Sequence, residues 1–263
     1  MKHLFAICAY KESAYLPACI DSLLRQTAPS QIILCTATPS DYLAGLAAQH
    51  GFDYCVNPDA PNIAGDWNFA LAEAKKRGAD FVTLCHQDDL YLPDYGKAFR
   101  EAAEKDPQLL IWFSDYGEQR GEEAVFSSRL LTIKRLLLTP LRPRFAQGWK
   151  LAKRLALCLG DPICCPAVTF NLGRIDLPLF QRGMTTNLDW QTWETLSRRK
   201  GRFVCDRRPL MLHRIHPGST TSQVLGEGGR TAQDEAMFRR FWPAPVARLL
   251  TRLYASSEKS NAL

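Results

Sequence analysis

Strand-like and helix-like segments alternate through the first 115 residues, and this alternation limits the fold more than any other feature. Short apolar runs occupy residues 4–9, 31–35, 52–56, 81–84 and 109–113, and helical patterns occupy residues 13–26, 40–50, 64–77 and 93–105. Strands that alternate with helices of about 10–15 residues indicate βαβ units and a parallel sheet. We therefore predict a Rossmann-like α/β fold, a mostly parallel sheet with flanking helices.

After Asp115 the pattern becomes irregular. The expected elements are a strand within residues 161–171, a helix N-capped by Asn187, and short strands at 202–205 and 210–213. The tail is predicted to form two helices, divided near Pro243 and Pro245. Its last helix carries an apolar stripe that packs in the core or serves as a docking surface, formed by Val246, Leu249, Leu250 and Leu253.

Polar residues follow the predicted parallel strands where each strand ends. They are Tyr10-Lys11-Glu12, Cys35-Thr36, Asn57, Gln87-Asp88-Asp89 and Ser114-Asp115. The carboxyl ends of parallel strands share one edge of a sheet, and open α/β sheets bind their ligands there. The chain has neither of the glycine-rich phosphate motifs, so a metal and basic side chains would have to meet phosphate charge.

The stretch from His86 to Asp89 is the first candidate for chemistry. One histidine and two aspartates follow a buried strand, and they offer nitrogen and oxygen ligands for Mg²⁺ or Mn²⁺. The alternative is that Asp88 and Asp89 only shape a turn and cap the helix after Pro93. These residues alone do not separate the two interpretations.

Residues 124–160 form a basic segment with eight basic residues and no acidic one. Leucine and tryptophan alternate with these charges, which is the composition of basic amphipathic helices at a membrane surface. The alternative is a pair of surface helices with solvated Lys and Arg faces. The net charge of +6 would permit nucleic acid, anionic membrane or phosphorylated ligands as partners. No apolar run approaches the roughly 20 residues of a membrane span, so we expect a cytoplasmic protein.

Several motifs together resemble the family 2 glycosyltransferases, inverting enzymes with the GT-A fold. Residues 7–12 and 16–27 are similar to the opening strand and first helix of that family, including its Ser-x-x-x-Gln-Thr ending. Asp66-Trp67-Asn68 after Asn62 resembles the segment beneath the nucleotide, and residues 86–89 take the place of the D-x-D metal motif. The order and spacing hold over about residues 1–221.

Two later motifs complete the resemblance. Leu188-Asp189-Trp190 resembles the motif that supplies the catalytic base, so the resemblance makes Asp189 the base for the acceptor hydroxyl. Arg214-x-His216-x-x-Ser219-x-Thr221 resembles the late R-x-H-x-x-S segment. The alternatives are an Asp189 that only favours the start of a helix, and a salt-bridged strand end at Arg214 and His216.

The resemblance implies a nucleotide-sugar donor, with a UDP-sugar first and a dTDP- or GDP-sugar as alternatives. It implies donor contacts from Ala9, Tyr10, Glu12, Thr36, Asn68, Gln87, Asp88 and Arg214. It implies Mn²⁺ or Mg²⁺ held by Asp88, Asp89, His86 and His216. Two positions depart from the family: His86 begins the metal motif in place of Asp, and Cys35-Thr36 replaces an acidic pair.

The resemblance also implies the division of the chain. Residues 1–221 would form the GT-A domain, with a donor half at 1–115 and an acceptor half at 116–221, followed by a helical tail at 222–263. The tail looks like a small bacterial branch associated with surface polysaccharide assembly. A hexosyltransferase acting on a glycan or lipid-linked acceptor at the inner face of the cell membrane is the prediction, with peripheral contact to anionic membrane and no nucleic acid.

Two other classes remain open on the sequence. A nucleotidyltransferase of nucleotide-sugar synthesis shares the fold class and the metal, but its usual glycine-rich N-terminal loop is replaced here by Ala9-Tyr10-Lys11-Glu12. A non-catalytic binding protein with the same fold is suggested by the two departures. The carboxylates at Asp88, Asp89 and Asp189 favour an enzyme.

Overall fold

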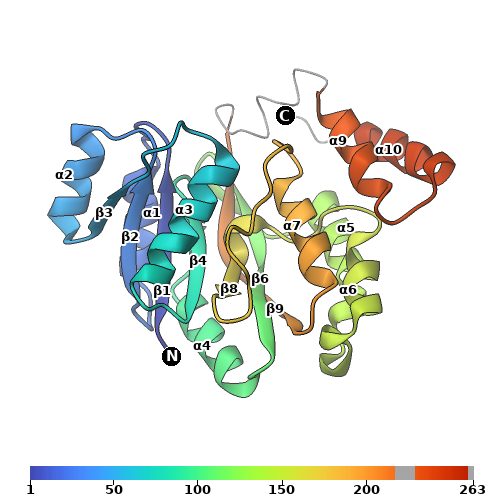
Figure 1. The fold of residues 1–263 in the computed structure, drawn as a ribbon, viewed down its shortest axis with the longest axis horizontal. Helices are drawn as coiled ribbons and strands as arrows, with labels where there is room; N and C mark the ends of the chain where they lie inside the picture. The colour runs from blue at the N-terminus through green and yellow to red at the C-terminus, as the bar shows by residue number, and fades with distance from the viewer. Residues whose placement is uncertain (217–228, 260–263) are drawn as a thin grey trace.

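The computed structural model describes residues 1–216 and 229–259. Within these residues a nine-stranded sheet has the order β3-β2-β1-β4-β8-β6-β9-β5, and β7 pairs with β6 (Figure 1). The strands are β1 (His3–Ala9), β2 (Gln31–Thr36), β3 (Asp53–Val56), β4 (Phe81–His86), β5 (Leu90–Tyr91), β6 (Leu109–Arg120), β7 (Glu123–Val125), β8 (Val168–Asn171) and β9 (Arg202–Ile215). The α-helices are α1 (Leu16–Leu24), α2 (Asp41–His50), α3 (Ile63–Lys76), α4 (Tyr95–Lys105), α5 (Arg129–Leu137), α6 (Lys150–Leu157), α7 (Leu188–Ser197), α9 (Gly229–Phe238) and α10 (Ala244–Lys259). The predicted α/β fold class is confirmed.

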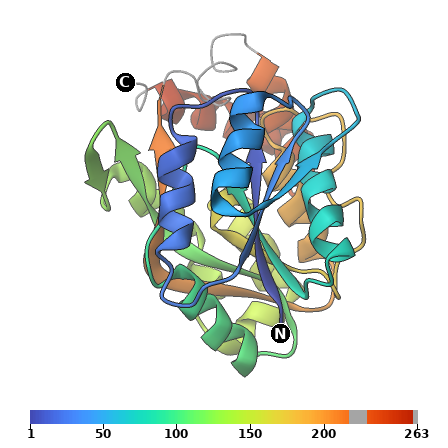
Figure 2. The same cartoon turned by 90° about the vertical axis from the view of Figure 1, so that its left-hand side faces the viewer.

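Both faces of the sheet are covered, which explains why the strands read as continuous apolar runs. Along β1, Phe5 and Ile7 belong to the core shared with α1, α2 and α4, whereas Leu4 and Ala6 belong to the core shared with α3, α6 and α7. Figure 2, turned by 90°, shows α1 and α3 at different sides of the twisted sheet. Successive side chains of a strand point to opposite faces, so each strand contributes to both cores.

The first four strands place their carboxyl ends together. β1 lies between β2 and β4, and all three run parallel with Ala9 opposite Thr36 and Cys8 opposite His86. β3 continues the parallel arrangement beside β2. This is the edge at which the sequence predicted a site.

The second half of the sheet differs from the prediction. The two short strands expected at 202–205 and 210–213 form one strand, β9, which pairs in parallel with β6 through register shifts beside Ser114 and Asp115. The strand expected at 109–113 continues to Arg120, and β5 and β7 were missed. Local patterns did not reveal them, because pairing with β9 and β6 extends these polar segments.

Two helix starts differ in detail from the prediction. α1 begins at Leu16, and Ser13 lies before it with its hydroxyl accepting a bond from the Tyr15 backbone N–H at 3.2 Å. Asn187 does precede α7, but its side chain makes no capping bond and donates to Asp234 of α9 at 2.7 Å. The Asn187 side-chain amide, which we expected to cap α7, therefore binds Asp234 of α9 instead.

The basic segment folds into α5 and α6, joined by two 3₁₀ turns at Thr139–Leu141 and Arg144–Gly148. The predicted apolar stripe of α10 is divided. Leu250 packs against the core, whereas Val246, Leu249 and Leu253 are exposed. None of the helices in the described residues combines the length and the hydrophobicity that crossing a membrane requires.

Candidate active site

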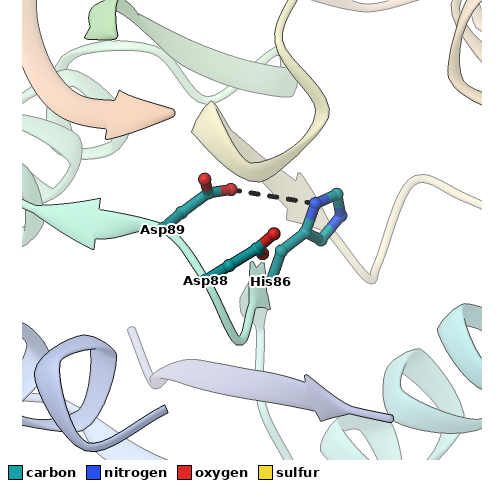
Figure 3. Close-up of side chains that lie close together, drawn as sticks. All are labelled: His86, Asp88 and Asp89. Atoms are coloured by element: carbon teal, nitrogen blue, oxygen red, sulfur yellow. Dashed lines mark ion pairs between the residues drawn. The ribbon is translucent and has the colours of Figure 1, made fainter. Parts of the chain in front are cut away.

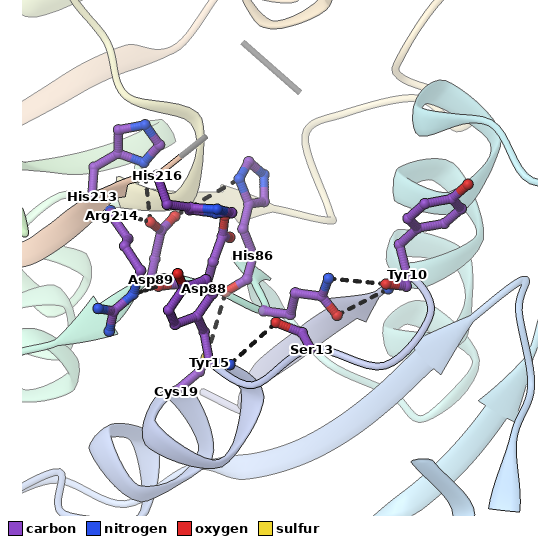
Figure 4. Close-up of polar contacts among 11 residues, drawn as sticks. Tyr10, Ser13, Tyr15, Cys19, His86, Asp88, Asp89, His213, Arg214 and His216 are labelled. Atoms are coloured by element: carbon purple, nitrogen blue, oxygen red, sulfur yellow. Dashed lines mark hydrogen bonds and ion pairs between the residues drawn. The ribbon is translucent and has the colours of Figure 1, made fainter. Parts of the chain in front are cut away.

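The ends of β1 and β4 are clamped together at the predicted edge. The Gln87 side chain donates to the Tyr10 carbonyl and accepts from the Tyr10 N–H, both at 3.0 Å (Figure 4). Lys11, the next residue, has a positive φ of 55° and donates its N–H to the Thr38 hydroxyl at 2.6 Å. A left-handed backbone at a non-glycine residue costs free energy, and these bonds hold the loop in that conformation.

Three predicted metal ligands meet at the end of β4. His86, Asp88 and Asp89 each bring one ligand atom into a group whose members lie within 4.8 Å of one another (Figure 3). Asp89 is fully buried, and its Oδ2 atom and Nε2 of His86 are buried without a hydrogen-bond partner among the described residues. Orphaned polar atoms of this kind require an explanation, and a divalent cation supplies one.

Strand β9 brings a second set of groups onto these aspartates. The His213 ring nitrogen Nδ1 lies 3.0 Å from Asp89 Oδ1, and the Arg214 N–H donates to the same oxygen at 2.9 Å. Nε of Arg214 donates to the Asp88 carbonyl at 2.8 Å, and Nε2 of His216 lies 2.9 Å from Asp88 Oδ2. His216, predicted as a metal ligand, therefore lies against Asp88 and outside the three-residue group. Figure 4 shows these side chains around the two carboxylates.

Aromatic rings form the walls of this cluster. Trp67 of α3 stacks on His86 with ring centroids 5.0 Å apart and planes 20° apart. The Tyr15 ring lies 4.6 Å from the Arg214 guanidinium carbon and 4.7 Å from the His216 ring. Stacked rings fix the orientation of these cationic and imidazole groups, so the site is organised before any ligand arrives.

The histidines alter the acidity of their carboxylate neighbours. Burial alone would raise the pKa of Asp88, but His86, the hydrogen bond from His216 and the nearby His213 lower it below its ordinary value. Burial opposes charge on His213 as well, yet Asp89 and Asp88 raise the pKa of that imidazole. Asp88 is therefore held as a carboxylate, the form that binds a cation.

The residues assigned to donor binding differ in how exposed they are and in what they contact. Ala9 is buried at the end of β1, Tyr10 is half exposed and Glu12 is exposed. Thr36 is buried, and its hydroxyl accepts from the Thr38 N–H at 2.9 Å. The Asn68 carboxamide oxygen accepts from the backbone of Leu179 and Phe180, so this asparagine ties α3 to the loop that precedes α7.

Asp189 lies in the first turn of α7. Burial raises the pKa of the half-buried Cys164 thiol, and so do the carboxylates Asp89, Asp189 and Asp161. Asp161 hydrogen-bonds to Asp189, and burial together with Asp189 raises the pKa of Asp161 well above its ordinary value. Lys134 opposes the shift. The structure thus pairs the predicted base with a second carboxyl group.

Four of these residues were missed by sequence reasoning: Tyr15, Lys134, Asp161 and His213. Of these, His213 had a local signal, because it stands immediately before the predicted Arg214. The others come from separate elements that only the fold brings together. Ser219 and Thr221, which completed the late motif, lie outside the described residues.

The chain matches a family model over residues 5–168, and that model is described as Glycosyl transferase family 2. No curated protein sequence gives a match. The matched range includes residues 5–9 of strand β1, the group at His86, Asp88 and Asp89, and the whole basic segment.

Several solved structures share the fold. The mannosyltransferase PcManGT from Pyrobaculum calidifontis, with GDP-Man and Mn²⁺, superposes with a TM-score of 0.65 at 13% identity, over 97% of this chain and 69% of that chain. Glucosyl-3-phosphoglycerate synthase from Mycobacterium tuberculosis, with Mn²⁺, UDP and glucosyl-3-phosphoglycerate, gives 0.61 at 16%, over 91% and 79%. TarS from S. aureus (residues 1–349), with UDP-GlcNAc, gives 0.60 at 11%, over 95% and 70%. The expected GT-A fold is confirmed.

Proposed function

Since the chain belongs to glycosyl transferase family 2, we propose that it moves a hexosyl group from a nucleoside-diphosphate sugar to a hydroxyl of a glycan or lipid-linked acceptor. The proposal includes inversion at the anomeric carbon and a role in bacterial surface polysaccharide synthesis. The observation that carries it is the convergence of His86, Asp88 and Asp89 with Arg214 at the carboxyl ends of β1 and β4.

The residues at this edge fit a divalent cation. Asp88 and Asp89 provide hard oxygen ligands, and neither Nε2 of His86 nor Oδ2 of Asp89 has a hydrogen-bond partner among the described residues. When bound there, Mn²⁺ or Mg²⁺ would neutralise the negative charge that develops on the diphosphate leaving group. The solved relatives that contain Mn²⁺ with UDP or GDP-Man support this assignment.

We assign Arg214 to the diphosphate as a second positive group. Its guanidinium is a planar fork of donors that matches phosphate oxygens, and the Tyr15 ring and the Asp88 carbonyl fix its position. A preformed positive group stabilises developing charge without reorganising during the reaction. His216, held against Asp88, adds a donor at the same place.

We assign the role of general base to Asp189. The acceptor oxygen attacks the anomeric carbon while its proton passes to the Asp189 carboxylate. The bond between that carbon and the diphosphate oxygen breaks, and its electron pair leaves with the diphosphate. A single displacement from the opposite face inverts the anomeric configuration. Burial and the neighbouring Asp189 raise the pKa of Asp161, and the hydrogen bond between the two carboxyl groups orients Asp189.

The donor is proposed to be a UDP-sugar, with dTDP- and GDP-sugars as alternatives. A thermal-shift panel of UDP, GDP, dTDP and CMP, each with Mn²⁺, Mg²⁺ or EDTA, tests this directly. A nucleotide present at 100 times its Kd should stabilise the fold by about 2.7 kcal/mol. We expect one nucleotide to do so only when the divalent cation is present.

If none of the nucleotides raises the melting temperature of a protein that melts cooperatively, the proposal is contradicted and a non-catalytic binding protein is favoured. A positive panel is followed by transfer of sugar to a hydroxyl acceptor. Transfer is the decisive readout for catalysis, because water can hydrolyse a nucleotide sugar without any base.

A further inference from the structure

Helix α6 exposes leucine side chains and buries a lysine, which is unusual for a helix that only covers a core. Leu151 and Leu155 lie on its outer side, 68% and 48% exposed, whereas Lys153 is completely buried. Surface helices normally place leucine inward and lysine outward, because burying apolar area is favourable and burying charge is costly.

Polar contacts with α7 fix α6 in this orientation. The Lys153 ammonium donates to the carbonyls of Arg199 and Gly201 at 2.7 and 3.1 Å, just past the end of α7. Arg154 forms an ion pair with Glu194 of α7 at 2.5 Å, and the Trp190 indole donates to the Leu157 carbonyl. The outward leucines are therefore set by the fold, and they do not result from loose packing.

The neighbouring helices α5 and α10 also expose large apolar side chains. Exposed large apolar side chains are concentrated on these elements, and we refer to them together as the apolar face. They are Phe126, Ile133, Leu136, Phe145, Trp149, Leu151, Leu155, Leu159, Val246, Leu249 and Leu253. Apart from these, the described residues expose only Met1, Tyr10, Leu24 and Val56 in this class. A Cβ at Gly160 would lie 3.0 Å from the Tyr254 ring of α10 and 3.6 Å from Leu137 of α5, so the three helices meet there. Figure 1 shows them at the end opposite α2.

Most of the charges near the apolar face are basic, and Glu122 and Glu123 just before Phe126 are the acidic neighbours in that part of the chain. The exposed cations on these elements are Arg129, Arg142, Arg144, Lys150, Arg248 and Arg252. No acidic residue occurs between 124 and 160 or between 244 and 255. The four other basic residues of the basic segment are engaged inside the fold: Lys134, Arg135, Lys153 and Arg154.

We propose that the apolar face docks on a membrane surface that contains anionic lipids. Tryptophan, phenylalanine and leucine enter the headgroup boundary, and the surrounding Arg and Lys side chains meet lipid phosphates. A second copy of the chain is a poorer occupant, because a symmetric contact would bring six like charges toward their counterparts.

This inference deepens the proposed function and rests on it for its purpose. α6 packs directly on α7, and α7 begins with Leu188 and Asp189, the assigned base. Docking through α6 would therefore bring a lipid-linked acceptor hydroxyl to the side of the site that holds the base.

The test is co-sedimentation of the full chain with vesicles of phosphatidylcholine, alone or with phosphatidylglycerol. We expect binding mainly to the anionic vesicles, weakened by salt because of screening. The double variant Leu151→Ser/Leu155→Ser should reduce the partition coefficient about tenfold, since each leucine loses its burial in the lipid. Lys150→Gln/Arg144→Gln should reduce binding to anionic vesicles and leave weak binding to neutral ones unchanged.

Leu24→Ser is the matched control, because Leu24 is as exposed as Leu155, at 48%, and lies on α1. It should bind vesicles like the wild type. No vesicle binding by the wild type, or an equal loss in Leu24→Ser, would overturn the proposal. So would a wild-type dimer that the leucine variants convert to monomer. Nucleotide and Mn²⁺ thermal shifts of the same proteins report the proposed function separately.

Discussion

The candidate site and the apolar face depart from ordinary burial in opposite directions. At the end of β4 the chain buries Asp89 completely and leaves its Oδ2 atom without a hydrogen-bond partner among the described residues, with His86 Nδ1 3.8 Å away. On α6 it exposes Leu151 and keeps Lys153 inside. Both arrangements are unfavourable for an isolated protein, since one desolvates charge and the other hydrates apolar area.

The difference teaches what each region is suited to bind. A buried carboxylate beside imidazole nitrogen is completed by a cation. An exposed apolar stripe ringed by Arg and Lys is completed by an apolar surface with negative charge. α7 connects the two regions, since it carries Asp189 in its first turn and packs on α6.

The largest expected effect is at Asp189. Asp189→Asn removes the proposed base, and general-base catalysis contributes about 10²–10⁴-fold to a rate, so transfer to acceptor should fall by roughly a thousandfold. Nucleotide binding by thermal shift should stay at the wild-type level. Asp176→Asn, at a carboxylate whose side chain is 84% exposed, is the control and should transfer normally. If Asp189→Asn transfers sugar to the acceptor at the wild-type rate, Asp189 is not the general base.

The buried carboxylate itself is tested by Asp89→Asn. The wild type should gain about 2.7 kcal/mol at a cation concentration of 100 times Kd, and the variant should gain nothing. In EDTA the variant should be less stable than the wild type, because the amide oxygen still accepts from the Arg214 N–H but the negative charge that pairs with His213 is lost.

Differential scanning fluorimetry with Mn²⁺ titrations measures both quantities. Asp59→Asn, at a carboxylate whose side chain is 65% exposed, should retain the full Mn²⁺ response. An undiminished response in Asp89→Asn would show that the buried carboxylate serves the fold alone.

The buried lysine of α6 is the next test. Lys153→Met keeps the apolar stem but leaves the carbonyls of Arg199 and Gly201 without this donor, which should cost about 2 kcal/mol of unfolding free energy. Urea denaturation measures the loss. Lys150→Met, on the exposed side of the same helix, should change stability by less than about 0.5 kcal/mol. Equal effects would mean that the inward lysine does not orient α6.

The smallest effect is expected for an outward leucine. Leu155→Ser should change the free energy of unfolding by less than about 0.5 kcal/mol, because this side chain is already 48% exposed in the folded chain. Leu157→Ala, on the buried side of α6, should cost about 2–5 kcal/mol in the same urea experiment. A large loss for Leu155→Ser would show that the apolar face is already covered within the folded protein.

The first four parallel strands follow from local pattern. β1, β2 and β4 are buried on both faces, so apolar runs mark them directly. β3, a partly exposed edge strand, also appears close to its expected bounds. Their carboxyl ends then locate the edge where His86, Asp88 and Asp89 gather. This much of the site could be read from the chain.

The contributions of β9 and α6 could not be read in this way. β9 is half polar, and its length depends on pairing with β6, so His213 reaches Asp89 only in the assembled sheet. The basic segment suggested helices with outward charges, yet tertiary contacts draw Lys153 inward. The amino-acid composition gives the number of charged side chains in a segment. The hydrogen-bond and ion-pair partners that the fold provides decide which of these side chains face solvent.

The sequence by itself determined the α/β alternation, the strand ends and the residue types available for a cation, because these depend on periodicity and on side-chain chemistry. The tertiary structure alone decided that His213 meets Asp89, that Asp161 pairs with Asp189, and that leucines of α6 face outward. Those outcomes require residues far apart in the chain to compete for the same hydrogen bonds and the same buried space, and no local pattern records that competition.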